Sequence, residues 1–435
     1  MTQPKQPILT SKYLNGRINK EGYDFFKDVV AEFSNGHKPS ANTPVFICVT
    51  HAYEGSLPMI HTVANMGEIV ALIPKNSTKT QYPHVVDVLK QSGIKVRDDV
   101  VKSKSGGEEG KTHLDNPAEV IKFIKDVVPE GRRFILMDHG GYFAPTLTEI
   151  QNEFQDRLVG VSEFTDNGHK RYEKLAVGVT CPIVSVAHSK LKRPADKEAG
   201  EAVAHAIDHV LRHTEGLKAK NPGMLKIGII GYGRLGSAAA KQLKSRGAEG
   251  ILVTDTDYIN LANAPSSGFI PTTIDDIVEK CDVIISATGA KALKPYHYAK
   301  MKDGAYIATV TSPDDELDIE RLKEGGTLVA DTANHLTATY KIGATGKKVH
   351  IIANGESANT LMPAGIGDPT LFLPEAEYLA ANIKLRDRPN NFVNGIQEIG
   401  KPDKNNIARM WLEHFHGVGL EHGASGSRAN RTGRQ

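Results

Sequence analysis

The sequence has few of the features that mark secreted, membrane-spanning or nucleic-acid-binding proteins. Its three cysteines, Cys48, Cys181 and Cys281, lie far apart in apolar surroundings, so we expect buried thiols and no disulfide. No apolar run approaches the roughly 18 residues of a transmembrane helix, and the first residues lack the apolar segment of a signal peptide. The 53 basic residues are balanced by 51 acidic ones, so no excess charge points to nucleic acid or an anionic membrane. These absences predict a cytoplasmic protein that binds neither nucleic acid nor a membrane.

A glycine-rich turn between a buried strand and a helix is the most informative feature present. The apolar run Ile227–Ile230 is followed by Gly231, Gly233 and Gly236 at GxGxxG spacing, and then by a helix with small residues on one face. In this motif the first glycine permits a tight turn, the second lets the backbone approach a pyrophosphate, and the third lets helix and strand pack closely. Arg234 and Leu235 open the helix, whose free N–H groups attract phosphates. The turn predicts a dinucleotide site.

The residue after the next strand predicts which dinucleotide binds. The strand Ile251–Thr254 ends on Asp255, nineteen residues after the third glycine. A carboxylate at this place accepts hydrogen bonds from ribose hydroxyls and repels a 2′-phosphate, which favours NAD over NADP. We therefore predict NAD as the cofactor.

Strands and helices alternate along the chain, which predicts an α/β fold with doubly wound parallel sheets. The strands expected in the first half are Val45–Thr50, Ile69–Ile73, Ile94–Val96, Phe134–Met137, Leu158–Val161 and Pro182–Val186. Those expected in the second half form a six-stranded sheet from Ile227–Ile230, Ile251–Thr254, Asp282–Ser286, Ala305–Val310, Thr327–Val329 and Val349–Ile352. Ligands of such sheets bind beyond the carboxyl ends of the strands. The polar residues at those ends, which predict a cleft, are His51, Asp138, His139, Glu163, His188 and Lys192.

Several motifs resemble S-adenosylhomocysteine hydrolase. The run GYGRLG…TDTDYIN…SATG…MKDGAYIATVTSPDDELDI resembles the cofactor domain of that family. Further matches, in the family's order, are GVSEFTDNGHKRYEKL, HSKLKRPADK and GIGDPTLFLPEAEYLAANIKL. The resemblance implies two Rossmann-like domains, with a substrate domain (1–197 and 356–400) split around an NAD-binding domain (198–355). It leaves 401–435 as a C-terminal helix and flexible tail, and it implies hinge closure and a homo-oligomer, usually a tetramer.

The resemblance also implies a reaction and the residues that perform it. The family oxidises a ribose 3′-hydroxyl with tightly held NAD, eliminates a 5′ thiol, adds water and then returns the hydride. Lys192 and Asp196 match the residues that hold and deprotonate the ribose hydroxyls, and His51 matches the histidine at the first strand end. The additional cofactor contacts that the resemblance implies are Asn260, Thr288, Gly289, Thr165, Asp166 and Asn167.

The substrate pocket departs from the family. His139 stands where the family has a catalytic aspartate, Phe164 where it has a sugar-binding glutamate, and Ser312 where it has a histidine. The family contacts adenine through a threonine, a glutamate and a histidine, and this chain has Tyr53, Gly55 and Asp368 at those positions. The tail also lacks the lysine and tyrosine with which the family's neighbouring subunit closes the cofactor site. We interpret these changes as a changed substrate, with His139 as a catalytic candidate and with Tyr53, Glu163 and Asp368 as substrate-binding candidates.

The sequence leaves several functions open. The first is an NAD-dependent enzyme that oxidises a secondary hydroxyl of a sugar or nucleoside-like substrate, with elimination or hydrolysis to follow. The second is a genuine S-adenosylhomocysteine hydrolase with a divergent pocket, and the third is a non-catalytic NAD-binding regulatory protein. A 2-hydroxyacid dehydrogenase lacks support because no Arg follows the Ala305 strand to bind a carboxylate. We predict no metal, since no Cys or carboxylate completes a set with His414, His416 and His422.

Overall fold

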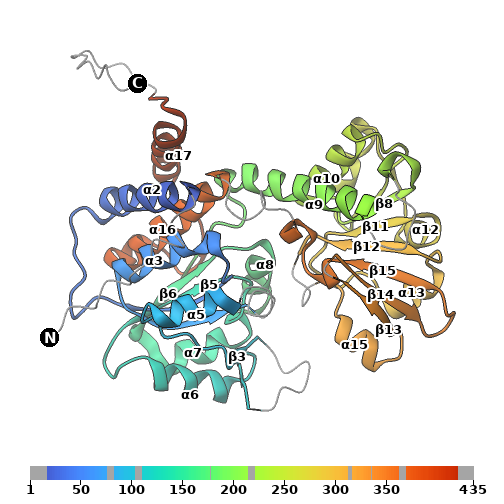
Figure 1. Cartoon of the computed structure of the whole chain (residues 1–435). Helices are drawn as coiled ribbons and strands as arrows, with labels where there is room; N and C mark the ends of the chain where they lie inside the picture. Colours follow the sequence, from blue (N-terminus) through green and yellow to red (C-terminus); the bar gives the residue numbers. More distant parts are fainter. Residues whose placement is uncertain are drawn as a thin grey trace.

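The computed structural model describes residues 17–75, 83–102, 110–176, 178–213, 221–311, 316–334, 336–361 and 369–419. These residues form two α/β lobes, and the long helix α9 (Arg193–His213) runs from one to the other (Figure 1). A six-stranded sheet is the centre of the first lobe, and an eight-stranded sheet is the centre of the second. The predicted α/β class with largely parallel sheets is confirmed.

The first sheet is parallel throughout and has the strand order β16-β7-β6-β5-β1-β2. Its strands are β1 (Val45–Thr50), β2 (Ile69–Pro74), β5 (Phe134–Asp138), β6 (Leu158–Glu163), β7 (Pro182–Ser185) and β16 (Gly395–Gln397). The strand expected at Ile94–Val96 is wrong. This segment makes a single bridge from Val96 to Leu72, because it is too short to add a strand to the sheet edge. A separate parallel pair, β3 (Val100–Val101) and β4 (Thr112–His113), lies nearby in the chain.

Alternation of apolar residues lets the first sheet bury both faces. Phe46 and Cys48 of β1 pack into one core with α2, α3, α5, α16 and α17, whereas Val45 and Ile47 pack into the opposite core with α6, α7 and α8. The helices of this lobe are α2 (Arg17–Ser34), α3 (Leu57–Met66), α5 (Pro83–Gln91), α6 (Pro117–Val127), α7 (Leu147–Phe154), α8 (Asp166–Leu175), α16 (Phe372–Asp387) and α17 (Lys401–His416). The three cysteines are buried free thiols, as expected.

The second sheet has the strand order β10-β9-β8-β11-β12-β15-β14-β13. Its strands are β8 (Ile227–Ile230), β9 (Leu252–Thr254), β10 (Ile270–Pro271), β11 (Val283–Ser286), β12 (Ala305–Thr309), β13 (Leu328–Ala333), β14 (Thr337–Ile342) and β15 (Lys348–Ile352). The first six in spatial order are parallel, in the order typical of dinucleotide-binding sheets. The expected count of six strands is wrong, because β10 is added at one edge and the antiparallel strand β14 lies between β15 and β13.

Helices cover both faces of the second sheet. α9 and α10 (Arg234–Ser245) pack with one face, and α12 (Ile274–Lys280), α13 (Pro295–Lys300) and α15 (Ile319–Glu324) pack with the other. The short helix α11 (Tyr258–Ala262) follows β9. None of the helices within the described ranges is both long and apolar enough to span a bilayer.

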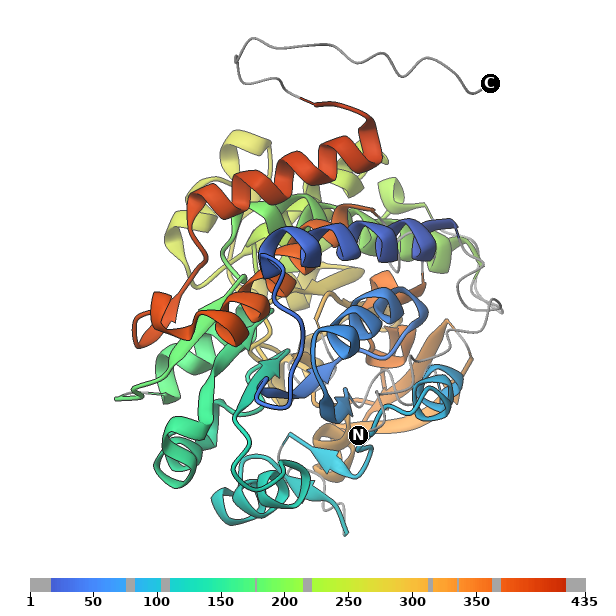
Figure 2. The same cartoon turned by 90° about the vertical axis from the view of Figure 1, so that its left-hand side faces the viewer.

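The chain returns to the first lobe after the second sheet. β16 pairs with β7, and α16 crosses the first sheet beside α2. Figure 2 shows α17 and α2 lying along the same face of this lobe. The first sheet is therefore built from segments that precede and follow the second one. α9 runs without a break through the expected boundary at 197/198, and the domain boundaries themselves stay a prediction.

Candidate active site

A cleft of about 1530 Å³ lies between the lobes and is lined by residues that follow the strands of both sheets. Sixteen of the predicted site residues line it, namely His51, Tyr53, His139, Thr165, Asp166, Asn167, Lys192, Asp196, Gly231, Gly233, Arg234, Leu235, Asp255, Asn260, Thr288 and Gly289. Because the carboxyl ends of parallel strands meet at one edge of a sheet, residues far apart in the sequence converge here. Their individual roles stay predictions.

The glycine-rich turn has the shape that a dinucleotide needs. Gly231 has φ +94°, and a Cβ there would lie 2.6 Å from the carbonyl oxygen of Ala287. A Cβ on Gly236 would overlap the carbonyl oxygen of Gly231, so this glycine packs behind the turn and does not line the cleft. Gly233 caps the amino end of α10, and a Cβ there would meet no atom within 4 Å. The bare backbone at a helix N-terminus can therefore take a pyrophosphate.

Asp255 is held ready at the end of β9. Its Oδ2 accepts a hydrogen bond from the Tyr232 N–H at 2.6 Å, and its Oδ1 accepts one from the Asp257 N–H at 2.8 Å. Each carboxylate oxygen can accept a second hydrogen bond, which leaves capacity for ribose hydroxyls. The residues present therefore fit NAD, with the glycine turn for its pyrophosphate and Asp255 for a ribose.

A buried carboxylate that sequence reasoning missed holds the turn after β11. Glu316 accepts hydrogen bonds from the Gly289 N–H at 2.7 Å, from Thr288 Oγ1 at 2.8 Å and from Thr311 Oγ1 at 2.5 Å. It is fully buried. Its sequence signal is weak, because it is the last of three consecutive acidic residues that look like solvent-exposed charge. Glu316 thus fixes the Thr288–Gly289 turn, which belongs to the second lobe and faces the first lobe.

The two lobes meet where this turn faces α8. A Cβ on Gly289 would overlap the side-chain amide of Asn167, so the asparagine lies directly against the glycine backbone. Thr165 caps α8 by accepting a hydrogen bond from the Gly168 N–H at 2.9 Å. Of the predicted cofactor contacts from the first lobe, Asn167 therefore contacts the second lobe, and Thr165 begins the helix that carries it.

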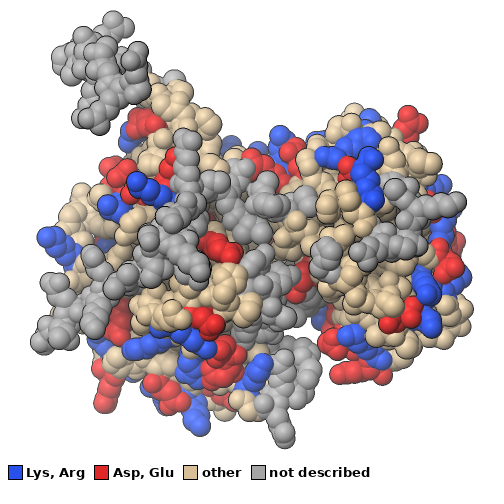
Figure 3. Space-filling view, viewed as in Figure 1, with Lys and Arg blue, Asp and Glu red and all other residues tan. Residues whose placement is uncertain are grey.

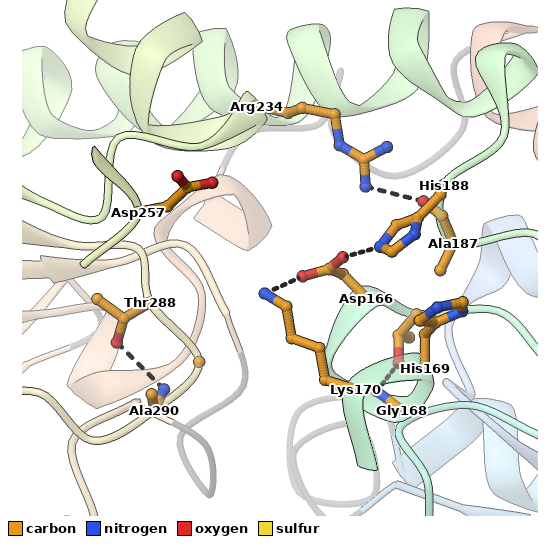
Figure 4. A network of polar contacts seen from close by, with 12 residues as sticks. Asp166, Gly168, His169, Lys170, Ala187, His188, Arg234, Asp257, Thr288 and Ala290 are labelled. Carbon is orange, nitrogen blue, oxygen red and sulfur yellow. Dashed lines mark hydrogen bonds and ion pairs between the residues drawn. The ribbon is translucent and has the colours of Figure 1, made fainter. Parts of the chain in front are cut away.

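Polar contacts fix the cleft wall next to this contact (Figure 4). Asp166 pairs with Lys170 at 2.6 Å and with His188 Nε2 at 2.8 Å. Arg234, from the cofactor turn, donates a hydrogen bond to the Ala187 carbonyl at 2.8 Å. The helix after the glycine turn is thereby tied to the loop that carries His188.

Lys192 lies almost buried at the base of the cleft, with 9% of its surface exposed. Its Nζ donates a hydrogen bond to the Phe164 carbonyl at 2.7 Å and lies 4.7 Å from the centre of the Phe164 ring. Burial lowers the pKa of Lys192, Asp196 opposes that effect, and Arg234 adds to it. Asp196, one turn further along the chain, forms an ion pair with Arg234 at 3.0 Å. A lysine with a lowered pKa next to a carboxylate can act as a base.

Aromatic contacts link the first lobe's other catalytic candidates. The His51 and His139 rings lie perpendicular with centres 4.7 Å apart, and the His139 ring stacks on Phe164 at 5.0 Å. Burial is the main cause that holds the pKa of both histidines well below the usual value, and the charge of Lys75 adds to it. Neutral imidazoles can accept or relay a proton.

Glu163, a predicted substrate contact, lies outside the lining of the cleft. It is fully buried below the cleft and does not line it. Its oxygens accept hydrogen bonds from the backbone N–H groups of Gly140, Gly141 and Thr165 at 3.0, 2.9 and 2.6 Å. This side chain braces the two loops that carry His139 and Thr165, and its role in substrate binding stays a prediction. Asp368, the remaining substrate-binding candidate, falls outside the described residues, as does Ser312.

Lys75 is a cleft residue that the sequence prediction missed. It directly follows β2, lines the cleft and is 6% exposed. The only signal for it was its place at a strand end, the rule that selected His51 and His139.

No group of three potential metal-binding side chains occurs among the residues that the structure describes.

Comparisons with known proteins agree with the geometry of the cleft. Residues 205–364 match the family described as S-adenosyl-L-homocysteine hydrolase, NAD binding domain. An S-inosyl-L-homocysteine hydrolase from Methanopyrus kandleri is 28% identical over 323 residues, which are 72% of this chain and 71% of the relative. An adenosylhomocysteinase from Sulfolobus acidocaldarius is 28% identical over 73% of this chain and 71% of its own. Another adenosylhomocysteinase, from Aeropyrum pernix, is 24% identical over 87% of this chain and 86% of the relative.

The match in the cofactor lobe covers the glycine turn, Asp255 and the Thr288–Gly289 turn, which are the parts that fit NAD. The relatives extend the similarity well beyond that lobe. Residues 205–364 therefore match the NAD-binding domain of this family, and the similarity along the rest of the chain supports a divergent member of the S-adenosylhomocysteine hydrolase superfamily and an NAD-dependent enzyme of this kind.

Proposed function

We propose that this enzyme oxidises a secondary hydroxyl on the sugar of a nucleoside-like substrate, and that the oxidation is transient and coupled to elimination or hydrolysis. The observation that carries the proposal is the pair Lys192 and Asp196, which shares one cleft with the glycine turn. A base and a hydride acceptor must reach the same H–C–O–H unit. The first lobe supplies the base, and the second lobe supplies the turn that would hold the hydride acceptor.

Lys192 is the proposed base for the hydroxyl proton. Burial favours its neutral form, and the carbonyl of Phe164 orients its Nζ through a hydrogen bond of 2.7 Å. Asp196 is the proposed acceptor for a neighbouring hydroxyl, and its ion pair with Arg234 keeps it in place. The chemistry that NAD supplies when bound is hydride transfer to and from the carbon that carries the hydroxyl.

His51 and His139 are the proposed groups for the second proton transfer. Once the hydroxyl is a ketone, the adjacent carbon is acidic, and a neutral imidazole can take its proton. The two rings contact each other and the His139 ring stacks on Phe164, so their positions are fixed before substrate binds. The resemblance supports this role for His139, because it stands where the family has a catalytic aspartate.

Replacement of Lys192 tests the base directly. The variant Lys192→Met keeps the apolar stem beside Phe164 and removes the amine, so we expect about 10²–10⁴-fold slower nicotinamide reduction by substrate. A panel of nucleosides, mixed with the NAD-loaded protein and followed by nicotinamide absorbance, measures it. The control is Lys190→Met, which changes an exposed lysine on the same 3-10 helix and should leave the rate unchanged. A Lys192→Met protein that reduces NAD at the normal rate would overturn the proposal.

A second candidate follows from the relatives, which carry the names S-inosyl-L-homocysteine hydrolase and adenosylhomocysteinase. In this case the chain hydrolyses one of these thioethers despite its altered pocket. A thiol reagent that detects released homocysteine decides the matter, with S-adenosyl- and S-inosyl-homocysteine supplied in parallel. Thiol release that is lost in Lys192→Met supports this candidate, and no release from either compound rejects it.

A further inference from the structure

Two buried glutamates, one in each lobe, hold the loops that face each other across the cleft. Glu163 ends β6 of the first sheet, Glu316 follows β12 of the second, and both are fully buried. Their carboxylates accept hydrogen bonds from backbone N–H groups and from hydroxyls. The donors are Gly140, Gly141 and Thr165 for Glu163, and Ser286, Thr288, Gly289 and Thr311 for Glu316. Because buried donors would lose their partner if a carboxylate moved, both loops are fixed. We call Glu163 and Glu316 the brace glutamates.

The first brace glutamate holds the segment that orients the proposed base. Glu163 accepts hydrogen bonds from the Thr165 N–H at 2.6 Å and from the Thr165 hydroxyl at 2.7 Å. A Cβ on Gly168 would overlap the Glu163 carboxylate, so the first turn of α8 rests directly on this side chain. Phe164 lies between the two held residues, and its carbonyl accepts the 2.7 Å hydrogen bond from Lys192 Nζ. The position of the Glu163 carboxylate therefore sets the direction of the Lys192 amine.

The second brace glutamate fixes the turn after β11. The Gly289 N–H donates a hydrogen bond to Glu316 at 2.7 Å, and the Thr288 hydroxyl donates one at 2.8 Å. In Figure 4, Thr288 lies on the opposite side of the cleft from Asp166, the first residue of α8. Gly289 has φ +60°, and a glycine has a wider choice of backbone conformations than other residues. The hydrogen bonds to Glu316 therefore select one conformation of this turn.

The two braced segments touch each other. A Cβ on Gly289 would overlap the Asn167 side-chain amide, so the asparagine lies against the bare glycine backbone. Asn167 belongs to the segment that rests on Glu163, and Gly289 is held by Glu316. A movement of either carboxylate would therefore displace this contact. The contact also connects the segment that orients Lys192 with the turn that the resemblance assigns to the cofactor.

We infer that the brace glutamates are paired positioning residues for the oxidation. Together they set the contact of Asn167 with Gly289, and through it the position of Lys192 relative to the turn that would hold the cofactor. The inference rests on the proposed function, because it concerns the alignment of the proposed base. Neither carboxylate lines the cleft, so both act through the loops that they hold. An error of about 1 Å in such an alignment can cost about 10²-fold in rate.

A double-mutant cycle tests this pairing, with the panel of nucleosides as substrates. Glutamine keeps the shape of each side chain but replaces one acceptor oxygen by an amide that faces other donors. We expect Glu163→Gln and Glu316→Gln each to lower kcat for nicotinamide reduction about 10–100-fold, with KM changed less than about threefold. Because both substitutions disturb one contact, the double variant should be at least about tenfold faster than the product of the two single effects. The control Glu375→Gln changes another buried glutamate of the first lobe that does not line the cleft, and kcat should stay unchanged.

Hydrogen exchange of the NAD-free protein gives a readout that needs no substrate. Glu316→Gln should speed exchange at least about tenfold in its own turn, 288–290, and also at the start of α8, 165–169, in the other lobe. Glu163→Gln should likewise speed exchange in both segments. A brace that served only its own loop would change exchange in one lobe alone. Asn167→Ala, which removes the contact, should abolish the effect across the lobes and keep the local one.

The outcomes separate this inference from the proposed function. Effects on kcat that multiply in the double variant, or exchange that changes in one lobe only, would overturn the pairing. A Glu163→Gln protein with a raised KM and a normal kcat would also overturn it, because Glu163 would then act as a substrate contact. Exchange that spreads across the lobes, in a protein whose NAD no nucleoside reduces, supports the pairing and counts against the proposed oxidation. If Glu163→Gln does not fold, Asn167→Ala takes its place in the cycle, with the same result expected.

Discussion

At the scale of single residues, the surroundings of Lys192 set its chemistry. The resemblance places a glutamate where this chain has Phe164, and the aromatic ring lies 4.7 Å from the Lys192 Nζ. An apolar neighbour raises the cost of charge on the amine, whereas a carboxylate would reduce it. Asp196 is therefore the nearby group that chiefly supports the protonated form. Glu163 and Asp166 support it more weakly, and Arg234 opposes it.

The pH dependence of oxidation should report this balance. A base must be deprotonated to act, so the rate should fall as the pH drops through the pKa of Lys192, at an inflection below the ordinary lysine value. Asp196→Asn removes the charge that raises this pKa. We therefore expect the inflection in kcat/KM to move to lower pH, together with a lower plateau because Asp196 is also the proposed acceptor for a substrate hydroxyl.

The control for this pH profile is Glu201→Gln, which neutralises a carboxylate elsewhere on α9 that pairs with Lys197. Its inflection should match that of the unaltered enzyme. If the Asp196→Asn profile keeps its inflection, or moves it to higher pH, Lys192 is not the group that titrates.

At the scale of elements, two glycines of the β8–α10 turn are needed for different reasons. Gly236 has no room for a side chain because its Cβ would overlap the carbonyl oxygen of Gly231. Gly233 has room, since a Cβ there meets nothing within 4 Å and its backbone is extended, with φ −72°. Gly236 is therefore required by the fold, and Gly233 is required only if a ligand approaches the backbone.

Two alanine substitutions test this distinction. Gly236→Ala should lower the free energy of unfolding of the NAD-free protein by about 1–3 kcal/mol, the usual cost of overpacking. Gly233→Ala should change that free energy by less than about 0.5 kcal/mol but weaken NAD binding at least about tenfold. Denaturant unfolding without NAD and fluorescence titration with NAD measure the two effects. Normal NAD affinity in Gly233→Ala would show that the pyrophosphate does not lie at this turn.

At the scale of the whole molecule, α9 couples the lobes. It starts directly after Lys192, carries Asp196 on its first turn and packs along α10 of the second lobe. At the crossing, a Cβ on Gly200 would lie 2.5 Å from the Leu235 carbonyl oxygen and 2.7 Å from the Ala238 Cβ. The close approach of these helices therefore sets the distance between the lysine–aspartate pair and the glycine turn.

Widening that crossing should impair oxidation more than cofactor binding. Gly200→Val forces α9 away from α10, so we expect at least about tenfold slower oxidation, because small displacements of catalytic groups are costly. NAD affinity should fall less, since α10 and its turn keep their place in the second sheet. The control Lys197→Val puts the same β-branched residue at an exposed site on α9. Rates that agree between the two variants would contradict the coupling.

Charge of both signs is interspersed over the face seen in Figure 3, consistent with the net charge of +2. This even distribution agrees with the absence of any charge excess in the sequence. The homo-oligomer that the resemblance implies stays a prediction.

The sequence by itself determined the local parts of this protein. The glycine spacing, the apolar strand before it and Asp255 after the next strand are short-range patterns, because the turn and its helix form from adjacent residues. Most strands were also predicted, since their apolar runs must be buried. The short, exposed edge strand β10 was not predicted, because it carries little hydrophobic signal. The antiparallel strand β14 between β15 and β13 was also missed, and the strand expected at Ile94–Val96 was wrong.

Only the tertiary structure decided which side chains share the cleft. Glu163 and Lys75 both lie at strand ends, yet backbone N–H groups enclose the first below the cleft and the second points into it. Glu316 is an ordinary acidic residue in the sequence and a buried brace of the Thr288–Gly289 turn in the fold. The physical reason is that burial and hydrogen bonding depend on neighbours from distant segments, which no local pattern specifies.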